Sequence, residues 1–352
     1  RFLNMKNNIS NTITPSMERG IKITPRVPDF KFDKNLIPKL WFSGDTGITT
    51  AWNALSIMGG VAEIRFVKTG QWLIDRINDE ELAKETQSFV QQEAFHSMIH
   101  SKFDRVLIEQ GLPVKIYREY CSDILSYIEE ISGHSMVSAA SLAGEQMIGE
   151  LGHTILGNPE VFDNASEALR KLWMWHAFEE VEHQAALHDA WTYVHGQSKD
   201  ARNLRVVGAI YLIAMLVIVW PIGIWTMHPK YSNHKRLSLK FWKPLIQQLF
   251  GSKGLMRGSG KNLWNLIRKD FHPFDIYDPI PILNRWRSKL TKPEWEKRFK
   301  LKDYGKNEGD VKINSIGLSD INKFARFQWA VLLRTKKFIS EVRSSRNNIA
   351  KA

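Results

Sequence analysis

Two stretches of this chain carry glutamate and histidine at helical spacing, and this pattern limits the folds that the chain can adopt. FVQQEAFHSMIH contains Glu93 and His96, and WMWHAFEEVEHQAALHDAW contains His176, Glu180 and His183. Each residue of an α-helix turns the chain by about 100°, so steps of three, four and seven keep side chains on one face. Each stretch therefore predicts a helix that aims carboxylate and imidazole groups in a common direction.

The residues that surround these groups are apolar and aromatic. Phe89 and Val90 precede Glu93, and Phe178 and Val181 flank Glu180. A carboxylate on such a face is costly to bury unless it is paired or bound to a metal ion. The pattern therefore favours a buried metal site over a solvated row of charges.

Two further glutamates, Glu63 and Glu145, lie on predicted helices of their own. One Glu from each of four helices, with a His three residues after two of them, is typical of the di-iron or di-manganese site of a ferritin-like bundle. His176 lies one turn before Glu180, and we interpret it as a third imidazole ligand, the alternative being a supporting histidine. The predicted ligands, which are also the predicted catalytic residues, are Glu63, Glu93, His96, Glu145, His176, Glu180 and His183.

Other acidic and histidine residues lie near these positions without matching the pattern. Glu150 and His153 form a similar pair, but Glu150 is about 140° round the helix from Glu145, and both cannot face one centre equally well. Residues expected to support the ligands from outside the site, or to face solvent, are His100, His153, Glu179 and Glu182. We expect His188 and His195 to be ordinary surface or core residues.

The fold predicted from these helices is all-α. Apolar periodicity and capping residues place long helices at about 45–77, 79–111, 115–132, 135–157 and 164–195, and no alternating strand pattern is present. Shorter helices are expected near 236–250, 261–268, 283–290 and 318–345. We expect an irregular arm over 1–40, a ferritin-like four-helix bundle over 41–200, and an additional apolar helix with a basic, largely helical C-terminal region over 201–352.

The single cysteine, Cys121, restricts the metal chemistry. It excludes an internal disulfide and argues against an iron–sulfur cluster or a zinc–thiolate site. Oxygen and imidazole ligands suit Fe(II) or Mn(II), so the predicted cofactor is a pair of iron ions, with Mn/Fe as an alternative. One cysteine and no apolar leader in the first 30 residues fit a cytoplasmic protein.

The chain has an acidic first part and a basic second part, and the second part contains a long apolar run. Residues 1–198 hold 18 Lys and Arg against 26 Asp and Glu, whereas residues 199–352 hold 31 against 11. The run Val206–Met227 has 22 residues without a charge, which is long enough to cross a bilayer. It could span the membrane, bend at Pro221 into one leaflet, or lie buried in the bundle or a dimer interface.

Basic residues flank this run on both sides, and a single crossing cannot place both flanks in the cytoplasm. We therefore expect the protein to lie at the inner face of the membrane. Aromatic residues alternate with the basic residues that follow the run, and this combination is typical of helices that lie on anionic lipid. Nucleic-acid binding is not expected, because no recognised motif accompanies the charge.

Several motifs are similar to those of a bacterial family described as predicted metal-dependent hydrolases. They are WFSGDTGITTAWNALSI followed by Glu63, QQEAFHSMIH, LWMWHAFEEVEH and FHPFDIYDP. The order of the ligands also resembles that of the di-iron arylamine N-oxygenases. That second resemblance implies the same seven ligands and does not imply an arylamine substrate.

The function that we predict from the sequence is a non-haem di-iron oxygenase that oxidises a hydrophobic or lipid-like small molecule. It would use O₂ as a co-substrate, an external electron donor and a redox partner, and it could form a homodimer. The alternative is a metal-dependent hydrolase that uses water activated by two metal ions. A third interpretation is a non-catalytic metal-binding helical protein, and an iron store is disfavoured by the length of the chain.

Overall fold

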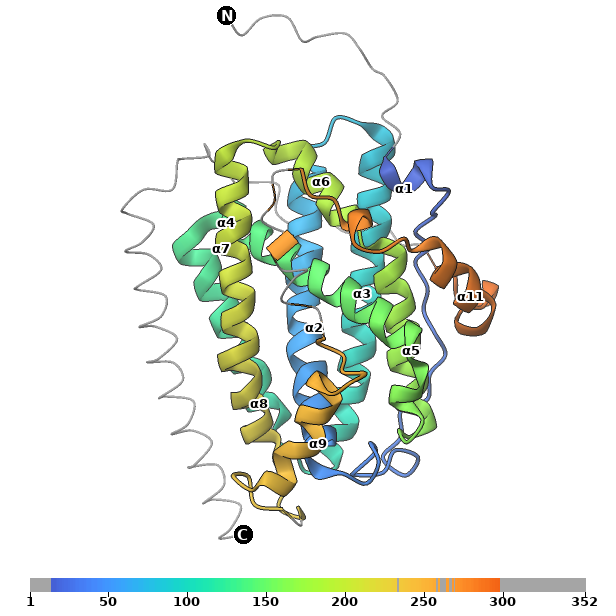
Figure 1. The fold of residues 1–352 in the computed structure, drawn as a ribbon, viewed down its shortest axis with the longest axis vertical. Helices are drawn as coiled ribbons and strands as arrows, with labels where there is room; N and C mark the ends of the chain where they lie inside the picture. Colours follow the sequence, from blue (N-terminus) through green and yellow to red (C-terminus); the bar gives the residue numbers. More distant parts are fainter. Residues whose placement is uncertain are drawn as a thin grey trace, which may run out of the picture.

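The chain folds into long helices that run side by side, with shorter segments wrapped around them. The computed structural model describes residues 14–297 except 233, 258, 260–263, 266–267 and 269. No strand occurs within these ranges, where pairing is limited to isolated bridges such as Phe42 with Ala165. The all-α prediction is confirmed (Figure 1).

Three long helices carry the first three predicted ligand glutamates. They are α2 (Thr46–Ile74), α3 (Glu80–Glu109) and α4 (Val114–Gly157). Asp45 and Asp79 cap the first two, because their side chains accept hydrogen bonds from backbone N–H groups three residues on. α2 packs along both α3 and α4. Helix α4 is kinked at Gly133, whose φ of 73° is outside the helical region, so the predicted stop at that glycine appears as a bend.

The last of the predicted long helices, 164–195, is wrong in its length. The structure divides it into α5 (Glu167–His183) and α6 (Ala186–His195). The side chain of Gln184, in the junction, contacts His153 and the backbone of Tyr277, so packing against distant segments redirects the chain. No Gly or Pro marks this break in the sequence.

The apolar run forms one continuous helical rod and not a hairpin. It comprises α7 (Lys199–Ala214), a π-helical turn (Met215–Val219) and α8 (Trp220–Met227). Pro221 lacks an N–H, and the wide turn just before it absorbs the lost hydrogen bond, so the alternative in which the run bends at Pro221 does not occur.

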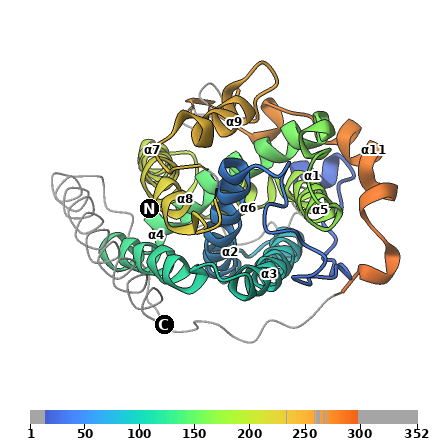
Figure 2. The same ribbon diagram turned by 90° about the horizontal axis from the view of Figure 1, so that it is seen from below.

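The rod lies against the bundle along one side. α7 packs on α4 and α8 packs on α2, as seen end-on in Figure 2. By length and composition this is the one helix of the described residues that could cross a membrane, and a third of its most apolar window is buried. The other side exposes Ile210, Ile213, Val217, Ile218 and Trp225.

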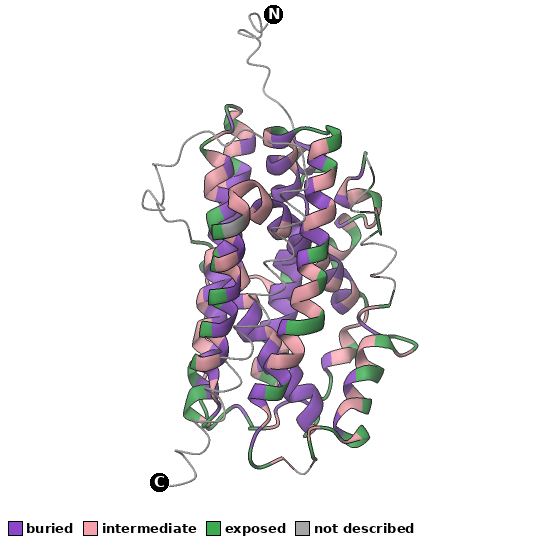
Figure 3. Ribbon diagram, turned by 90° about the vertical axis from the view of Figure 1, so that its left-hand side faces the viewer, coloured by how far each residue is buried: buried purple, intermediate pink, exposed green. Residues whose placement is uncertain are grey.

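The remaining elements lie on the surface of the bundle. Helix α1 (Pro15–Glu18) and residues 19–40 run past α5. Helix α9 (Leu239–Phe250) packs on α2, and α11 (Ile280–Leu290) packs on α5. Single 3₁₀ turns lie at Pro159–Phe162, Pro273–Asp275 and Pro293–Trp295. The helix expected at 318–345 and most of that at 261–268 lie outside the described residues. Buried residues line the inner faces of the long helices (Figure 3).

Candidate metal centre

All seven predicted ligands converge inside the bundle. Glu63 comes from α2, Glu145 from α4, and the remaining residues come from α3 and α5. Each of the seven is buried. Their ligand atoms form overlapping groups that lie within 4.8 Å of one another, which is close enough to surround metal ions.

The first group surrounds the imidazole of His183. Its Nε2 atom lies 3.1 Å from Glu93 Oε1, 3.3 Å from Glu145 Oε2 and 3.1 Å from Glu180 Oε2. The side-chain oxygen of Gln92 accepts a hydrogen bond from His183 Nδ1 at 2.9 Å. That bond places the lone pair of Nε2 toward the three carboxylates.

The second group lies on the other side of Glu180. His96 Nδ1 is 3.2 Å and His176 Nε2 is 2.6 Å from Glu180 Oε1, and His176 Nε2 is also 3.4 Å from Glu63 Oε1. Glu180 therefore belongs to groups on both sides. This is the position that a bridging carboxylate would take between two cations.

His100, which the sequence predicts only as a supporting residue, lies within the cluster itself. His100 Nε2 lies 3.3 Å from Glu63 Oε1 and 3.1 Å from His176 Nδ1, and its Nδ1 is 2.7 Å from Ser56 Oγ. Its position one turn beyond His96 was the available signal. A Cβ atom at Gly60 would come within 2.9 Å of His100 Cβ, so the glycine lets α2 approach α3 beside the site.

Several ligand atoms have no hydrogen-bond partner among the described residues. Both oxygens of Glu93 and of Glu145 are in this state, as are Glu63 Oε2 and His96 Nδ1. Orphaned buried carboxylate oxygens are costly, and native structures normally satisfy them. Four buried glutamates carry charge that a pair of divalent cations would balance, so this donor set fits a two-metal centre.

Protons compete for the same atoms. Burial raises the pKa of Glu145 to about 7, and burial with the charges of Glu145 and Glu180 raises the pKa of Glu93 well above its usual value. Burial opposes charge on His183, but the carboxylates of Glu180, Glu145 and Glu93 together outweigh it and raise the pKa of His183 well above the usual value. Metal binding must therefore release protons from these groups.

Two acidic residues beside the site serve as its outer support. Glu179 and Glu182 are buried and both bind Arg26, whose Nη1 donates to Glu179 Oε1 and to Glu182 Oε2 at 2.9 Å. Glu182 also accepts from the side chain of Gln92 and the backbone of Thr24. The prediction of a supporting position is thus met for both, while the solvated alternative is wrong.

The aromatic residues close the centre off from solvent. The Phe89 ring meets the His183 ring edge-on at 5.1 Å between centroids, and Trp175 meets His96 at the same separation. Trp173 stacks on His176 at 6.0 Å. These aromatic rings pack around the histidines of the cluster and separate the carboxylates from solvent.

Glu150, His153 and His195, which were not predicted as ligands, lie apart from the cluster. Glu150 accepts a hydrogen bond from Gln146, and His153 faces Gln184 and stacks on Tyr277. His195 is a core residue, stacked on Trp191 at 4.4 Å. None of these is within the metal-sized groups of the described residues.

A smaller group combines His188, Asp189 and His272. Both ring nitrogens of His272 are engaged, because Nδ1 accepts from the backbone N–H of Phe274 and Nε2 lies 3.0 Å from Asp189 Oδ1. A histidine held in this way has no lone pair left for a metal ion. We therefore interpret this group as the link between α6 and the segment around His272.

Comparison with known proteins corrects the functional prediction. The model of a family described as predicted metal-dependent hydrolase matches residues 24–276. No curated protein and no solved structure matches the chain. The family match contradicts the oxygenase prediction and agrees with the hydrolase alternative, while the ferritin-like and N-oxygenase resemblances are not confirmed. Because the match covers more than half of its length, the chain belongs to the family of predicted metal-dependent hydrolases.

Proposed function

We propose that this protein is a hydrolase and that its reaction takes place at the buried Glu and His cluster. The observation that carries the proposal is the set of unpartnered oxygens on Glu93 and Glu145, which lie in groups of metal-sized dimensions. The family match supports the reaction class. The O₂ co-substrate, electron donor and redox partner belonged to the oxygenase prediction and are set aside with it.

The ligand assignment follows the groups described above. Glu93, Glu145 and His183 would hold one cation, Glu63, His96 and His176 would hold the other, and Glu180 would contribute to both. Carboxylate and imidazole ligands without thiolate favour Fe(II) or Mn(II). Cys121 is buried outside these groups.

A pair of such cations supplies Lewis acidity that polarises a carbonyl or phosphoryl group and lowers the pKa of water. In hydrolysis the water oxygen bonds to the carbonyl carbon or phosphorus, the bond to the leaving group breaks, and one proton passes from water to the leaving group. We assign the transfer of that proton to His100 Nε2, which lies beside Glu63 and is oriented by Ser56. The Trp and Phe wall keeps bulk water from competing.

The test uses full-length protein that is stripped with a chelator and reloaded anaerobically with Mn(II) or Fe(II). p-Nitrophenyl butyrate, p-nitrophenyl phosphate and bis(p-nitrophenyl) phosphate cover carboxylic and phosphoric esters. We expect metal-dependent hydrolysis of one of these classes, with one product oxygen derived from ¹⁸O-labelled water. Product oxygen from any other source would overturn the proposal.

The matched variants lie on one helix. Glu93→Gln removes a predicted ligand, whereas Glu85→Gln changes a buried glutamate of α3 that binds Thr14 outside the cluster. We expect Glu93→Gln to lose bound metal and hydrolysis together, and Glu85→Gln to keep both. Unchanged metal content and rate in Glu93→Gln would remove the cluster from the reaction.

A further inference from the structure

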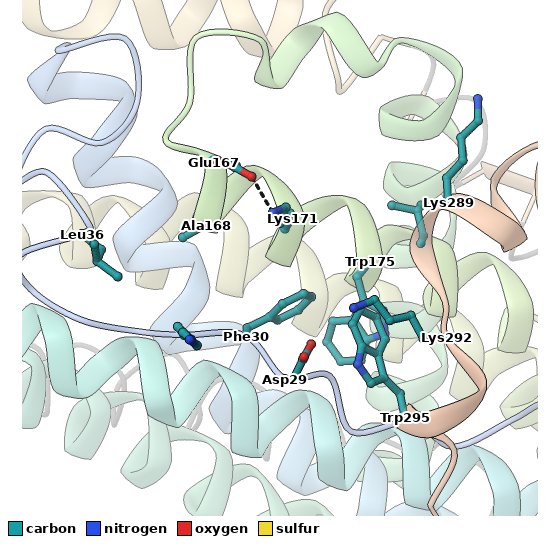
Figure 4. Close-up of a pocket in the computed structure, with 12 residues that line it drawn as sticks. Asp29, Phe30, Leu36, Glu167, Ala168, Lys171, Trp175, Lys289, Lys292 and Trp295 are labelled. Atoms are coloured by element: carbon teal, nitrogen blue, oxygen red, sulfur yellow. Dashed lines mark hydrogen bonds and ion pairs between the residues drawn. The ribbon is translucent and has the colours of Figure 1, made fainter.

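A cleft of about 560 Å³ opens beside the candidate metal centre. Its walls come from three parts of the chain that are far apart in sequence: the N-terminal arm at Asp29–Leu36, the outer side of α5, and the end of α11 with the segment that follows it. This volume is within the range of sites that bind small molecules. Figure 4 shows Phe30, Trp175 and Trp295 gathered at one end of the cleft, across from Glu167 and Lys171.

Two indole N–H groups of this wall have no hydrogen-bond acceptor among the described residues. They belong to Trp175, which is 1% exposed, and Trp295, which is 8% exposed. The edge of Phe30 packs against both rings, at 5.6 Å and 5.7 Å between centroids. A buried donor without a partner is costly, so a ligand oxygen that reached either nitrogen would relieve that cost.

The charges of the cleft favour a negatively charged ligand. Glu167 is neutralised by Lys171, whose ammonium lies 2.5 Å from Glu167 Oε1. Among the other lining residues, Lys31, Lys289 and Lys292 oppose the single carboxylate of Asp29. The Lys292 ammonium lies 5.0 Å from the centre of the Trp295 ring, whose indole N–H has no partner among the described residues. Cations and N–H donors at one place are the groups that bind carboxylate and phosphate oxygens.

One side chain separates the cleft from the candidate metal ligands. Trp175 lines the cleft, and its ring meets the ring of His96 at 5.1 Å between centroids and 89° between planes. The apolar part of the lining, made by Phe30, Leu36 and the two indoles, continues up to this ring. A ligand in the cleft therefore lies one indole away from the cluster.

We propose that this cleft binds the substrate and that the substrate is an organic anion, with a carboxylate or phosphate group on an apolar body. The anion meets Lys292 and the indole N–H groups, and the apolar body lies along Phe30 and Trp175. The word substrate rests on the proposed hydrolase function, whereas the binding of the anion does not.

The test compares two fluorescent probes on the full-length protein at low ionic strength. 8-Anilinonaphthalene-1-sulfonate carries an anionic group, and N-phenyl-1-naphthylamine is its neutral counterpart. Lys292→Gln should weaken the anionic probe about tenfold and leave the neutral one unchanged, as expected for the loss of a charge-assisted contact. Lys84→Gln, an exposed lysine of α3 outside the cleft, is the matched control.

The indole donor is tested separately. Trp295→Phe keeps an aromatic ring and removes the N–H, and we expect the affinity of the anionic probe to fall several-fold. Trp225→Phe, on α8 away from the cleft lining, should have no effect. Equal losses for both probes in Lys292→Gln, or the same result for Trp295→Phe and Trp225→Phe, would overturn the proposal.

Competition identifies the anionic group. Displacement of the bound probe by benzoate assigns a carboxylate, displacement by phenyl phosphate assigns a phosphate, and displacement by neither contradicts the proposal. The same titration on Glu93→Gln separates the two hypotheses. If that variant binds the probe normally while the metal-loaded parent hydrolyses no ester, the hydrolase function fails and the anion cleft stands.

Discussion

His96 donates a hydrogen bond from Nε2 to Glu179 Oε2 over 3.1 Å, and this contact determines which nitrogen faces the cluster. With Nε2 protonated, the lone pair of Nδ1 is directed at Glu93 and Glu180. Burial opposes charge on His96, but Glu93 and the contacts with Glu179 and Glu180 raise its pKa well above the usual value. A carboxylate behind a ligand histidine is a common way to fix its orientation.

Replacement of Glu179 should therefore weaken metal binding without removing a ligand. We expect Glu179→Gln to lower metal affinity about 10- to 100-fold, because the amide no longer enforces the Nε2–H tautomer as a carboxylate does. Competition with a chromophoric chelator measures the affinity. Glu167→Gln, on the same helix but exposed, is the control and should bind metal like the parent. Parental affinity in Glu179→Gln would contradict this role.

Arg26 should be important for stability, because it neutralises two buried carboxylates. Arg26 is 2% exposed, and it contacts Glu179 and Glu182, which are 0% and 2% exposed. Arg26→Met leaves buried negative charge that Arg287 compensates only at Glu182. We expect a loss of about 3–5 kcal/mol in the free energy of unfolding, measured by urea denaturation of metal-free protein.

The control for Arg26 is an arginine in a solvent-exposed pair. Arg19 faces Asp278 at 3.6 Å, with about half of each side chain exposed. Arg19→Met should change the free energy of unfolding by at most about 1 kcal/mol. Similar effects of the two substitutions would show that burial of the Arg26 pair does not matter.

The sequence predicts the inward-facing glutamates and histidines well because their positions follow from local helix geometry. Steps of three, four and seven residues fix a common face before any tertiary contact is made. Arg26 was not predicted, since it lies 153 residues from Glu179 and comes from an arm expected to be irregular. The contact between Trp295 and Phe30 was not predicted either, because these residues are also far apart in sequence. Contacts of this kind depend on how the arm and the C-terminal segment wrap around α5.

Acid should destabilise the protein through buried histidines, of which His195 is the clearest. Its Nδ1 donates to the backbone oxygen of Trp191, and burial lowers its pKa to about 4. The histidine has a pKa of about 6.5 in the unfolded chain. Between about pH 6.5 and 4 it is therefore protonated in the unfolded chain and neutral in the folded protein. Stability is therefore full above about pH 6.5 and falls as the pH drops toward 4, by about 1.4 kcal/mol per unit for this residue.

The comparison that isolates this effect is His195→Gln, in which a neutral amide replaces the ring. The variant should lose stability on acidification less steeply than the parent, by the equivalent of one proton between about pH 6.5 and 4. Urea titrations of metal-free protein at closely spaced pH values measure both slopes. Parallel curves for parent and variant would mean that His195 is protonated in the folded state.

The rod from α7 to α8 gives the last prediction, which concerns location. Its outward side carries Ile213 and Val217, the latter 67% exposed, while Arg202 lies in its first turn and Lys230 lies just after its last residue. An apolar face between basic ends is suited to an anionic lipid surface. We expect the full-length protein to co-sediment with vesicles that contain phosphatidylserine, and to do so less with neutral vesicles.

Val217→Glu should reduce this binding about tenfold, because a charge would enter the lipid. Leu36→Glu, which changes an exposed leucine of the N-terminal arm, should leave the binding unchanged. If both variants bind like the parent, the exposed side of the rod is not the membrane contact.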